Sequence, residues 1–146
     1  MHFHQTDGGK QSSGFFAEKR DCTVRSLACA ADIPYVDAHR ILKKSGRKNG
    51  RGWWSERGLA TASQEGLLDF VAIPFGRTVR NMRINYPTVA QVLARLPQGR
   101  SIFNTRNHAF AVLDGVIFAT GLIGLRSRVK MVFEVILKES TCSGSL

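Results

Sequence analysis

Two residues of this sequence, Cys22 and His108, have the types and surroundings that thiol chemistry needs. Cys22 follows Asp21 at the predicted start of a helix, where the aspartate side chain can cap the free amides of the first turn. A thiol placed there lies in the field of those amides, which favours the thiolate, and Arg25 adds positive charge one turn later. His108 opens an apolar strand, and a histidine held rigidly there can act as the base for a cysteine. These residues predict a Cys–His dyad.

The other two cysteines are not predicted to take part. Cys29 lies two helical turns after Cys22, roughly 10 Å away at the helical rise, which is too far for a disulfide within one helix. Alanines flank Cys29 on both sides, so it is predicted to be a core residue. Cys142 falls in a polar C-terminal stretch. A core role for Cys22 stays open as well, and the presence of His108 is what favours chemistry.

The elements that must position the dyad follow in a simple order. Hydrophobic periodicity predicts helices over 21–31, 34–45 and 55–68, a short strand over 70–73 and a further helix over 88–96. Strands are predicted over 101–105, 109–113, 116–120 and 129–137. Asp114-Gly115 is typical of a two-residue hairpin turn. Helices followed by strands predict an α+β fold, with the N-terminal helices packed on one side of a C-terminal antiparallel sheet.

Length and composition divide the chain into three parts. At 146 residues one domain is expected, extending over 20–137. A flexible arm rich in Gly, Ser and Gln is expected over 1–19, and a disordered tail over 138–146. The apolar runs are too short to span a membrane. The first residues resemble no export signal and the cysteine count is odd, so we expect reduced thiols in the cytoplasm.

The net charge of +10 predicts an acidic partner. Basic and aromatic side chains concentrate in one predicted loop, and the candidates for partner binding are Lys43, Lys44, Arg47, Lys48, Arg51, Trp53 and Trp54. Such a surface suits an acidic protein, or nucleic acid bound without sequence preference, because no base-reading motif accompanies it. The alternative is a solvated loop whose tryptophans pack inward. No nucleotide fingerprint or metal-ligand spacing is present, so neither a cofactor nor a metal is predicted.

The two motifs around the dyad also support a family resemblance. The first is Asp21-Cys22-x-x-Arg25-Ser26-Leu27, and the second is Asn107-His108-Ala109-x-Ala111-Val112-Leu113-Asp114-Gly115-Val116. Together they resemble the small papain-like cysteine-protease-fold proteins common in bacteriophages, and the likeness extends over about residues 20–137. The resemblance implies a papain-like domain with Cys22 as nucleophile and His108 as general base. It also implies the host cytoplasm as the location of a phage-encoded chain.

The resemblance further implies a third residue that orients the imidazole. Strand alternation in the hairpin points to position 119, where the family pattern has an aspartate and this chain has Ala119. Asn104 and Thr120 are the other candidates for orienting His108. Papain has a glutamine about six residues before its cysteine, where this chain has Phe16; Gln11 or a backbone amide is left to stabilise an oxyanion.

Two functions therefore stand side by side. The first is a thiol hydrolase or acyl-transfer enzyme that acts on an amide, peptide or isopeptide bond through Cys22 and His108. Its expected substrate is an acidic protein or peptide, such as a host protein. The second is a catalytically inactive papain-like fold that binds an acidic host protein or nucleic acid through its basic surface, as Ala119 suggests.

Overall fold

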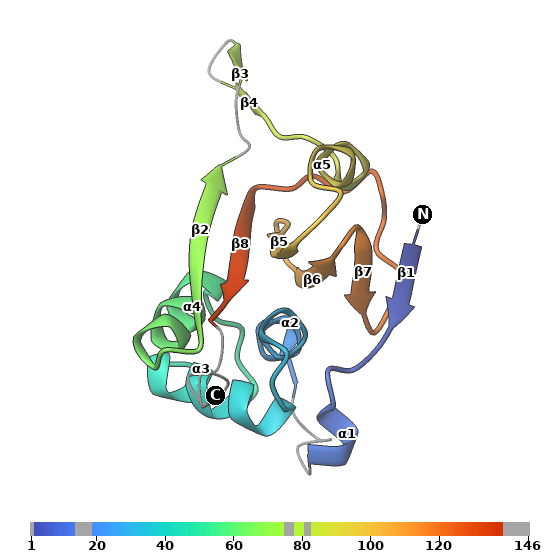
Figure 1. Cartoon of the computed structure of the whole chain (residues 1–146). Coiled ribbons are helices and arrows are strands. Elements are labelled where there is room, and N and C mark those ends of the chain that lie inside the picture. The colour runs from blue at the N-terminus through green and yellow to red at the C-terminus, as the bar shows by residue number, and fades with distance from the viewer. Residues whose placement is uncertain (1, 14–18, 75–77, 81–82, 139–146) are drawn as a thin grey trace, which may run out of the picture.

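The computed structural model describes residues 2–13, 19–74, 78–80 and 83–138. A six-stranded sheet runs in the order β1-β7-β6-β5-β8-β2 (Figure 1). Its strands are β1 His2–Gln5, β2 Leu68–Pro74, β5 Arg100–Asn104, β6 Ala109–Leu113, β7 Val116–Ala119 and β8 Met131–Leu137. β3 Thr78–Arg80 and β4 Arg83–Asn85 pair as a separate hairpin. The helices are α1 Lys10–Ser13, α2 Cys22–Ala31, α3 Tyr35–Ser45, α4 Ser55–Gln64 and α5 Val89–Arg95.

Helices cover both faces of this sheet, which corrects the expectation of one covered side. α2, α3 and α4 lie on one face and α5 lies on the other (Figure 1). The cause is visible in β5 and β6, since residues 101–103 and 109–112 are buried without a break. Strands buried on both faces need a cover on each. Two apolar clusters result, one beneath α2 to α4 and one beneath α5.

Most of the predicted helices and strands are confirmed. The capping and turn residues near their ends make the local contacts expected of them. Thr88 caps α5, where its hydroxyl accepts from the Gln91 amide at 3.2 Å and the Gln91 side chain accepts from the Thr88 amide at 2.9 Å. Asp114 and Gly115 turn the β6–β7 hairpin with φ of 50° and 78°. The helix predicted over 55–68 ends at Gln64 instead, because the chain turns there and β2 begins at Leu68.

The N-terminal residues differ from the flexible arm that was expected. β1 pairs in parallel with β7, so the sheet is mixed rather than antiparallel. The side chains of β1 alternate: Phe3 packs against the cluster beneath α5, while the His4 ring lies 4.8 Å from the Phe118 ring. α1 follows at Lys10. Of the expected arm, 1 and 14–18 lie outside the described residues, as do 139–146 of the expected tail.

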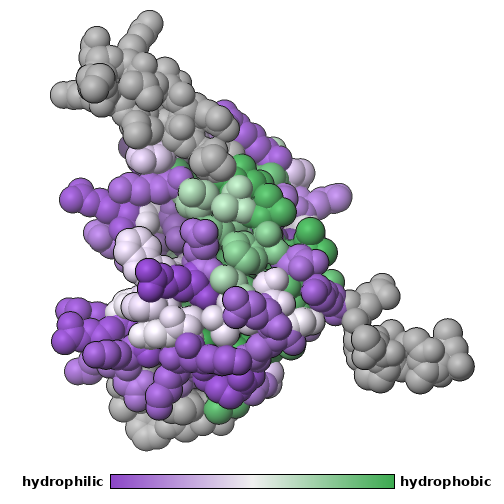
Figure 2. Space-filling view, turned by 90° about the vertical axis from the view of Figure 1, so that its left-hand side faces the viewer, coloured by the Kyte–Doolittle hydropathy of each residue, from purple (hydrophilic) through white to green (hydrophobic). Residues whose placement is uncertain are grey.

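The opposite edge of the sheet is β2, which pairs with β8 on one side only. Figure 2 looks onto this side of the molecule and shows apolar side chains gathered in a band, with hydrophilic side chains around it. Val71 on β2 and Ile136 on β8 are exposed apolar residues of these strands. The candidate dyad is built elsewhere, at the ends of α2 and β6.

Candidate active site

Cys22 and His108 line the same pocket, which has a volume of about 660 Å³. Four element ends meet there: Cys22 begins α2, Ser55 begins α4, Asn104 ends β5 and His108 directly precedes β6. The remaining described lining residues are Thr23, Gly52, Trp53, Trp54, Thr105, Arg106, Asn107, Ala109, Lys130 and Met131. The two residues that the sequence predicts as a dyad therefore lie on the lining of one pocket.

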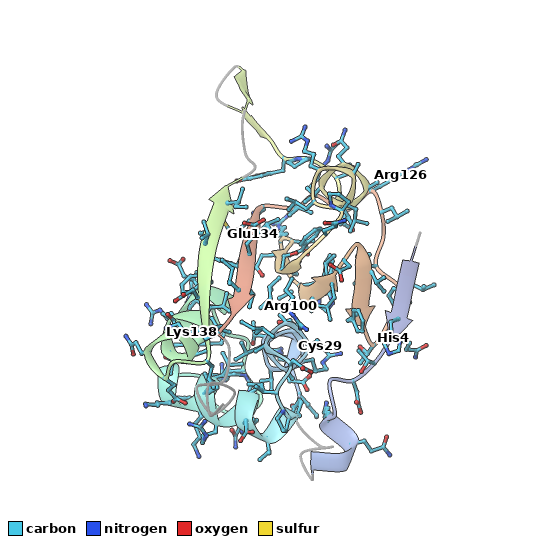
Figure 3. The ribbon with its side chains drawn as sticks, in the orientation of Figure 1. His4, Cys29, Arg100, Arg126, Glu134 and Lys138 are labelled. Carbon is cyan, nitrogen blue, oxygen red and sulfur yellow. The ribbon has the colours of Figure 1, made fainter. Side chains whose placement is uncertain are left out.

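Small side chains set the position of α2 over the sheet. Ala109 and Ala111 of β6 are buried in the cluster shared with α2, and they let the helix approach β6 closely. At the far end of α2, Arg100 of β5 donates to the carbonyls of Cys29 and Ala30 at 3.5 and 3.3 Å (Figure 3). A cation at the carboxyl end of a helix complements its dipole. The alanines and Arg100 thus fix α2 on the sheet, and Cys22 is the first residue of that helix.

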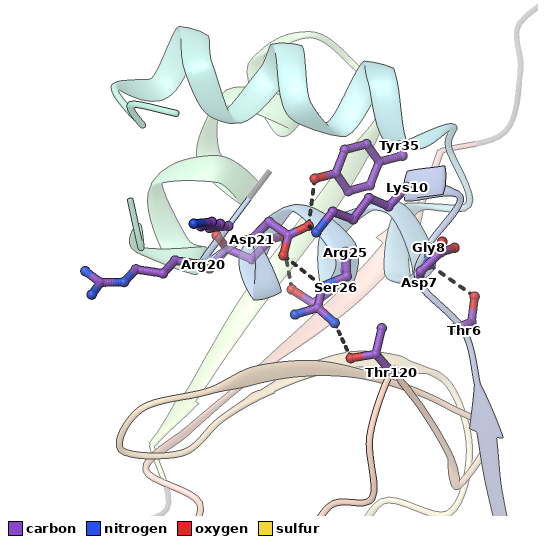
Figure 4. Close-up of polar contacts among 12 residues, drawn as sticks. Thr6, Asp7, Gly8, Lys10, Arg20, Asp21, Arg25, Ser26, Tyr35 and Thr120 are labelled. Atoms are coloured by element: carbon purple, nitrogen blue, oxygen red, sulfur yellow. Dashed lines mark hydrogen bonds and ion pairs between the residues drawn. The ribbon is translucent and has the colours of Figure 1, made fainter. Parts of the chain in front are cut away.

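Asp21 does not cap α2 with its side chain, which corrects the predicted role. The residue is 3% exposed, and its carboxylate faces other donors (Figure 4). Tyr35 donates its hydroxyl to Asp21 Oδ2 at 2.7 Å, and Lys10 Nζ lies 3.3 Å from the same oxygen. Arg25 Nε lies 3.2 Å from Oδ1. Because the carboxylate is engaged this way, the first-turn amides of α2 are left without a side-chain cap.

Thr120 binds Arg25 rather than the candidate base. Arg25 Nη1 donates to Thr120 Oγ1, so the guanidinium joins the start of α2 to the end of β7 (Figure 4). Thr120 does not line the pocket among the described residues. Its predicted role as an orienting residue is thus not supported by its contacts, while its hold on Arg25 fixes a positive charge near His108.

His108 is half-buried and held by its own backbone. Its carbonyl accepts from the amide of Thr105 at 2.9 Å and from the Thr105 hydroxyl at 3.3 Å, which closes a tight loop between β5 and β6. Its ring lies 6.0 Å from the ring of Phe110. Burial lowers the pKa of His108 below its usual value, and the positive charge of Arg25 lowers it further. The imidazole is therefore neutral near pH 7, the form that can accept a proton.

Asn104 is the predicted polar residue that the structure places in the pocket. Ser55 donates its hydroxyl to Asn104 Oδ1 at 3.0 Å. Since that oxygen is already engaged, the amide nitrogen is the group of Asn104 that remains for a ligand. Asn104 pairs with Ala109 across β5 and β6, and paired side chains share one face of a sheet, here the face covered by α2.

Gln11 and position 119 lie away from the pocket. Gln11 is an exposed residue of α1, and its backbone amide donates to Asp7 Oδ2 at 3.0 Å. Gln11 is not among the described residues that line the dyad pocket. Ala119 is buried in the cluster beneath α5 together with Phe110 and Ile117. The side chain at position 119 thus belongs to the apolar core on the face of the sheet opposite α2. It offers no polar group to the imidazole of His108.

The predicted basic surface divides into three groups. Arg47 is buried, and its Nη2 donates to the carbonyls of Lys19 and Arg20 at 3.2 and 3.4 Å. This corrects its predicted role, because Arg47 anchors the segment before Cys22 and is not a surface group. Lys43, Lys48 and Arg51 are exposed. Lys44 Nζ lies 3.2 Å from Glu65 Oε2, and the Glu65 carboxylate also forms an ion pair with Arg40.

The two tryptophans have different environments. Trp53 is half-buried, donates its indole N–H to Ser45 Oγ at 2.9 Å and is covered by the Arg57 guanidinium 5.3 Å from the ring. Trp54 is 68% exposed. It lines the dyad pocket and a neighbouring pocket of about 560 Å³ that also contains Glu56 and Arg57. Both tryptophans thus face the candidate site.

Cys22 and Cys29 are both free thiols. Cys29 packs against the core as predicted, and burial raises the pKa of its thiol to about 11. Among the described residues, no group of three His, Cys, Asp or Glu side chains is placed to hold a metal ion. Each helix in the described part of the chain is too short or too polar to cross a lipid bilayer.

Comparison of this chain with protein-family models, curated proteins and solved structures finds no significant match.

Several pocket residues were not singled out as site residues by the sequence. Ser55 begins a helix that carried no catalytic signal, and Thr23 lies beside Cys22 with a buried hydroxyl that has no hydrogen-bond partner among the described residues. Arg106 and Lys130 are exposed residues of the pocket lining, and the position of Arg106, two residues before His108 in the sequence, could have indicated it. The contact of Ser55 with Asn104 joins residues far apart in the chain, so spacing could not predict it.

Proposed function

We propose that this protein is a thiol hydrolase or acyl-transfer enzyme acting on an amide, peptide or isopeptide bond. Cys22 is the nucleophile and His108 is the general base. The observation that carries the proposal is that a helix-start cysteine and a strand-start histidine from distant parts of the chain line one open pocket. Nucleophile and base must share such a site for the thiol to be activated.

The chemistry follows from the state of each group. Neutral His108 takes the proton of the Cys22 thiol as sulfur attacks the substrate carbonyl carbon. The tetrahedral intermediate collapses when the imidazolium gives that proton to the leaving amine nitrogen, and a thioester on Cys22 remains. Water completes hydrolysis, or an amine completes acyl transfer. Because the pKa of His108 is low, its imidazolium is a strong proton donor to the leaving group.

The groups that stabilise the oxyanion come from α2 and β5 in this proposal. The first-turn amides of α2 carry no side-chain cap, and Asn104 lines the same pocket with its oxygen already bonded to Ser55. Amide donors of this kind are typical of oxyanion holes. The architecture, with a cysteine helix packed on a sheet that carries the histidine, also supports a relationship to the papain-like proteins of bacteriophages. A cytoplasmic location, in the host for a phage-encoded chain, belongs to the same proposal.

An acylation assay tests this function without knowledge of the natural substrate. The protein is mixed with p-nitrophenyl acetate, and p-nitrophenolate release is followed together with the intact mass. We expect a burst close to one equivalent and an acetyl group on Cys22. Cys22→Ala abolishes the burst, and His108→Gln slows it at least tenfold. Cys29→Ala is the matched control and keeps the burst, because burial raises the pKa of that thiol to about 11 and Cys29 is not among the described residues of the pocket lining.

A burst that persists in Cys22→Ala would refute the nucleophile. An unchanged burst rate in His108→Gln, with the fold intact by circular dichroism, would refute the base.

The second candidate function is binding of an acidic partner by an inactive fold. The observation that favours it is Ala119, which lies in the apolar cluster and offers the imidazole no partner. Under this alternative Cys22→Ala leaves partner binding intact, whereas Lys48→Gln with Arg51→Gln weakens it. Binding of an acidic protein that requires Cys22 would contradict it.

A further inference from the structure

The dyad pocket is positively charged on one side. Arg106 and Lys130 are exposed and line the pocket, whose described lining residues include no Asp or Glu. Within the described part of the chain neither of these two cations forms an ion pair. Their charges are therefore not neutralised by a neighbouring carboxylate there.

The backbone holds both cations next to the candidate chemistry. Arg106 lies in the bend that immediately precedes His108. The amide of Lys130 donates to the carbonyl of Asn104 at 2.8 Å, and its ammonium lies 5.7 Å from the ring of Tyr86. A sphere of the pocket's volume, about 660 Å³, is roughly 11 Å across, close to the Debye length of about 10 Å in 0.1 M salt. At that salt concentration the charges of Arg106 and Lys130 therefore act mainly on groups bound near them, and at lower salt they reach across the pocket.

The neighbouring pocket has a different charge. It shares Trp54, Ser55, Asn104 and Met131 with the dyad pocket, but its lining also includes the carboxylate of Glu56 beside Arg57. With one acid and one base, the lining of the neighbouring pocket is close to neutral, so an anionic group is favoured beside Arg106 and Lys130. This difference between the two pockets orients an anionic substrate.

We infer that the substrate is an acidic peptide, with a carboxylate beside the reacting carbonyl held by Arg106 and Lys130. This inference rests on the proposed function, and it names the substrate class of the same site. A carboxylate accepts hydrogen bonds from both a guanidinium and an ammonium, and the exposed face of Trp54 offers a surface for the adjoining chain. An acidic substrate also suits the charge of +10.

Two alkylating reagents of nearly equal size test the inference. Iodoacetate carries a carboxylate where iodoacetamide carries a neutral amide, so the ratio of their rates at Cys22, divided by the same ratio for glutathione, reports local charge preference. We expect this normalised ratio to be about threefold to tenfold above one at low salt and to fall as salt is added. Arg106→Gln with Lys130→Gln returns it to about one. Lys48→Gln with Arg51→Gln, which removes two cations outside the described lining, leaves it raised.

The outcomes separate this inference from the proposed function. Rapid alkylation by iodoacetamide with a normalised ratio near one in the native protein overturns the inference and leaves the dyad standing. If neither reagent modifies Cys22, the dyad fails, and tryptophan fluorescence decides the inference. Tighter binding of acetylated tetraglutamate than of tetraglutamine, lost in Arg106→Gln with Lys130→Gln, then supports an acidic ligand, and equal binding overturns it.

Discussion

Replacement of Gly46 by alanine should destabilise the protein strongly and disturb the pocket. Gly46 ends α3 with φ of 122° and ψ of −3°, a conformation that costs a residue with a side chain about 1–3 kcal/mol. A Cβ there would lie 2.7 Å from Cζ2 and 3.0 Å from Cη2 of Trp53. The indole of Trp53 cannot move freely, because its N–H donates a hydrogen bond to Ser45 Oγ and the Arg57 guanidinium covers its ring. Overpacking of this kind adds about 1–3 kcal/mol.

Gly50 provides the matched control. It also has a positive φ, 76°, but a Cβ there would meet nothing within 4 Å. Gly50→Ala should therefore cost only the backbone strain, about 1–2 kcal/mol, against about 4 kcal/mol for Gly46→Ala. Urea denaturation followed by circular dichroism measures both, and the melting temperature of Gly46→Ala should fall by about 10 °C. Equal losses in the two variants would refute the packing of Trp53 on Gly46.

Four further predictions concern the site and its surroundings. Arg25→Gln removes a nearby positive charge, so the pKa of His108 should rise toward its ordinary value in an NMR titration, and the alkylation of Cys22 should begin at higher pH. Since burial keeps His108 neutral, its favourable contribution to stability is present above about pH 6.5 and is lost as the pH falls. Cys29, with a pKa of about 11, is ionised to about one part in a thousand at pH 8, so peptide mapping after brief alkylation should find Cys22 modified before Cys29. Asp21→Asn should cost about 2–3 kcal/mol in urea denaturation, because it leaves two cations without their carboxylate.

The order and type of most elements could be predicted because their signals are local. Thr88 with Gln91, Asp114 with Gly115 and the helical stripe after Cys22 each depend on residues a few positions apart. The strand at His2–Gln5 could not, since its partner β7 is more than a hundred residues away and glycines follow it in the sequence. Burial of β5 and β6 on both faces likewise depends on the packing of α5 against the sheet, which is not a local property of either strand.

The candidate site was predicted in part for the same reason. Cys22 and His108 carry their signals in their own neighbourhoods, whereas the role of Asp21 depends on Tyr35 and Lys10, which approach from two other helices. Asp21, which the sequence predicts as a helix cap, thus belongs to a buried network of ion pairs and hydrogen bonds instead. Arg47 was mistaken for a surface group because nothing local shows that it reaches the carbonyl of Lys19.

The central claim is that His108 activates the thiol of Cys22. The most direct test is the second-order rate constant for alkylation of Cys22 by iodoacetamide at pH 7, measured in the native protein and in His108→Gln with peptide mapping. We expect the rate to fall at least tenfold in the variant, while the fold and the slow reaction of Cys29 stay unchanged. A rate for Cys22 that is the same in both proteins would show that His108 does not activate the thiol.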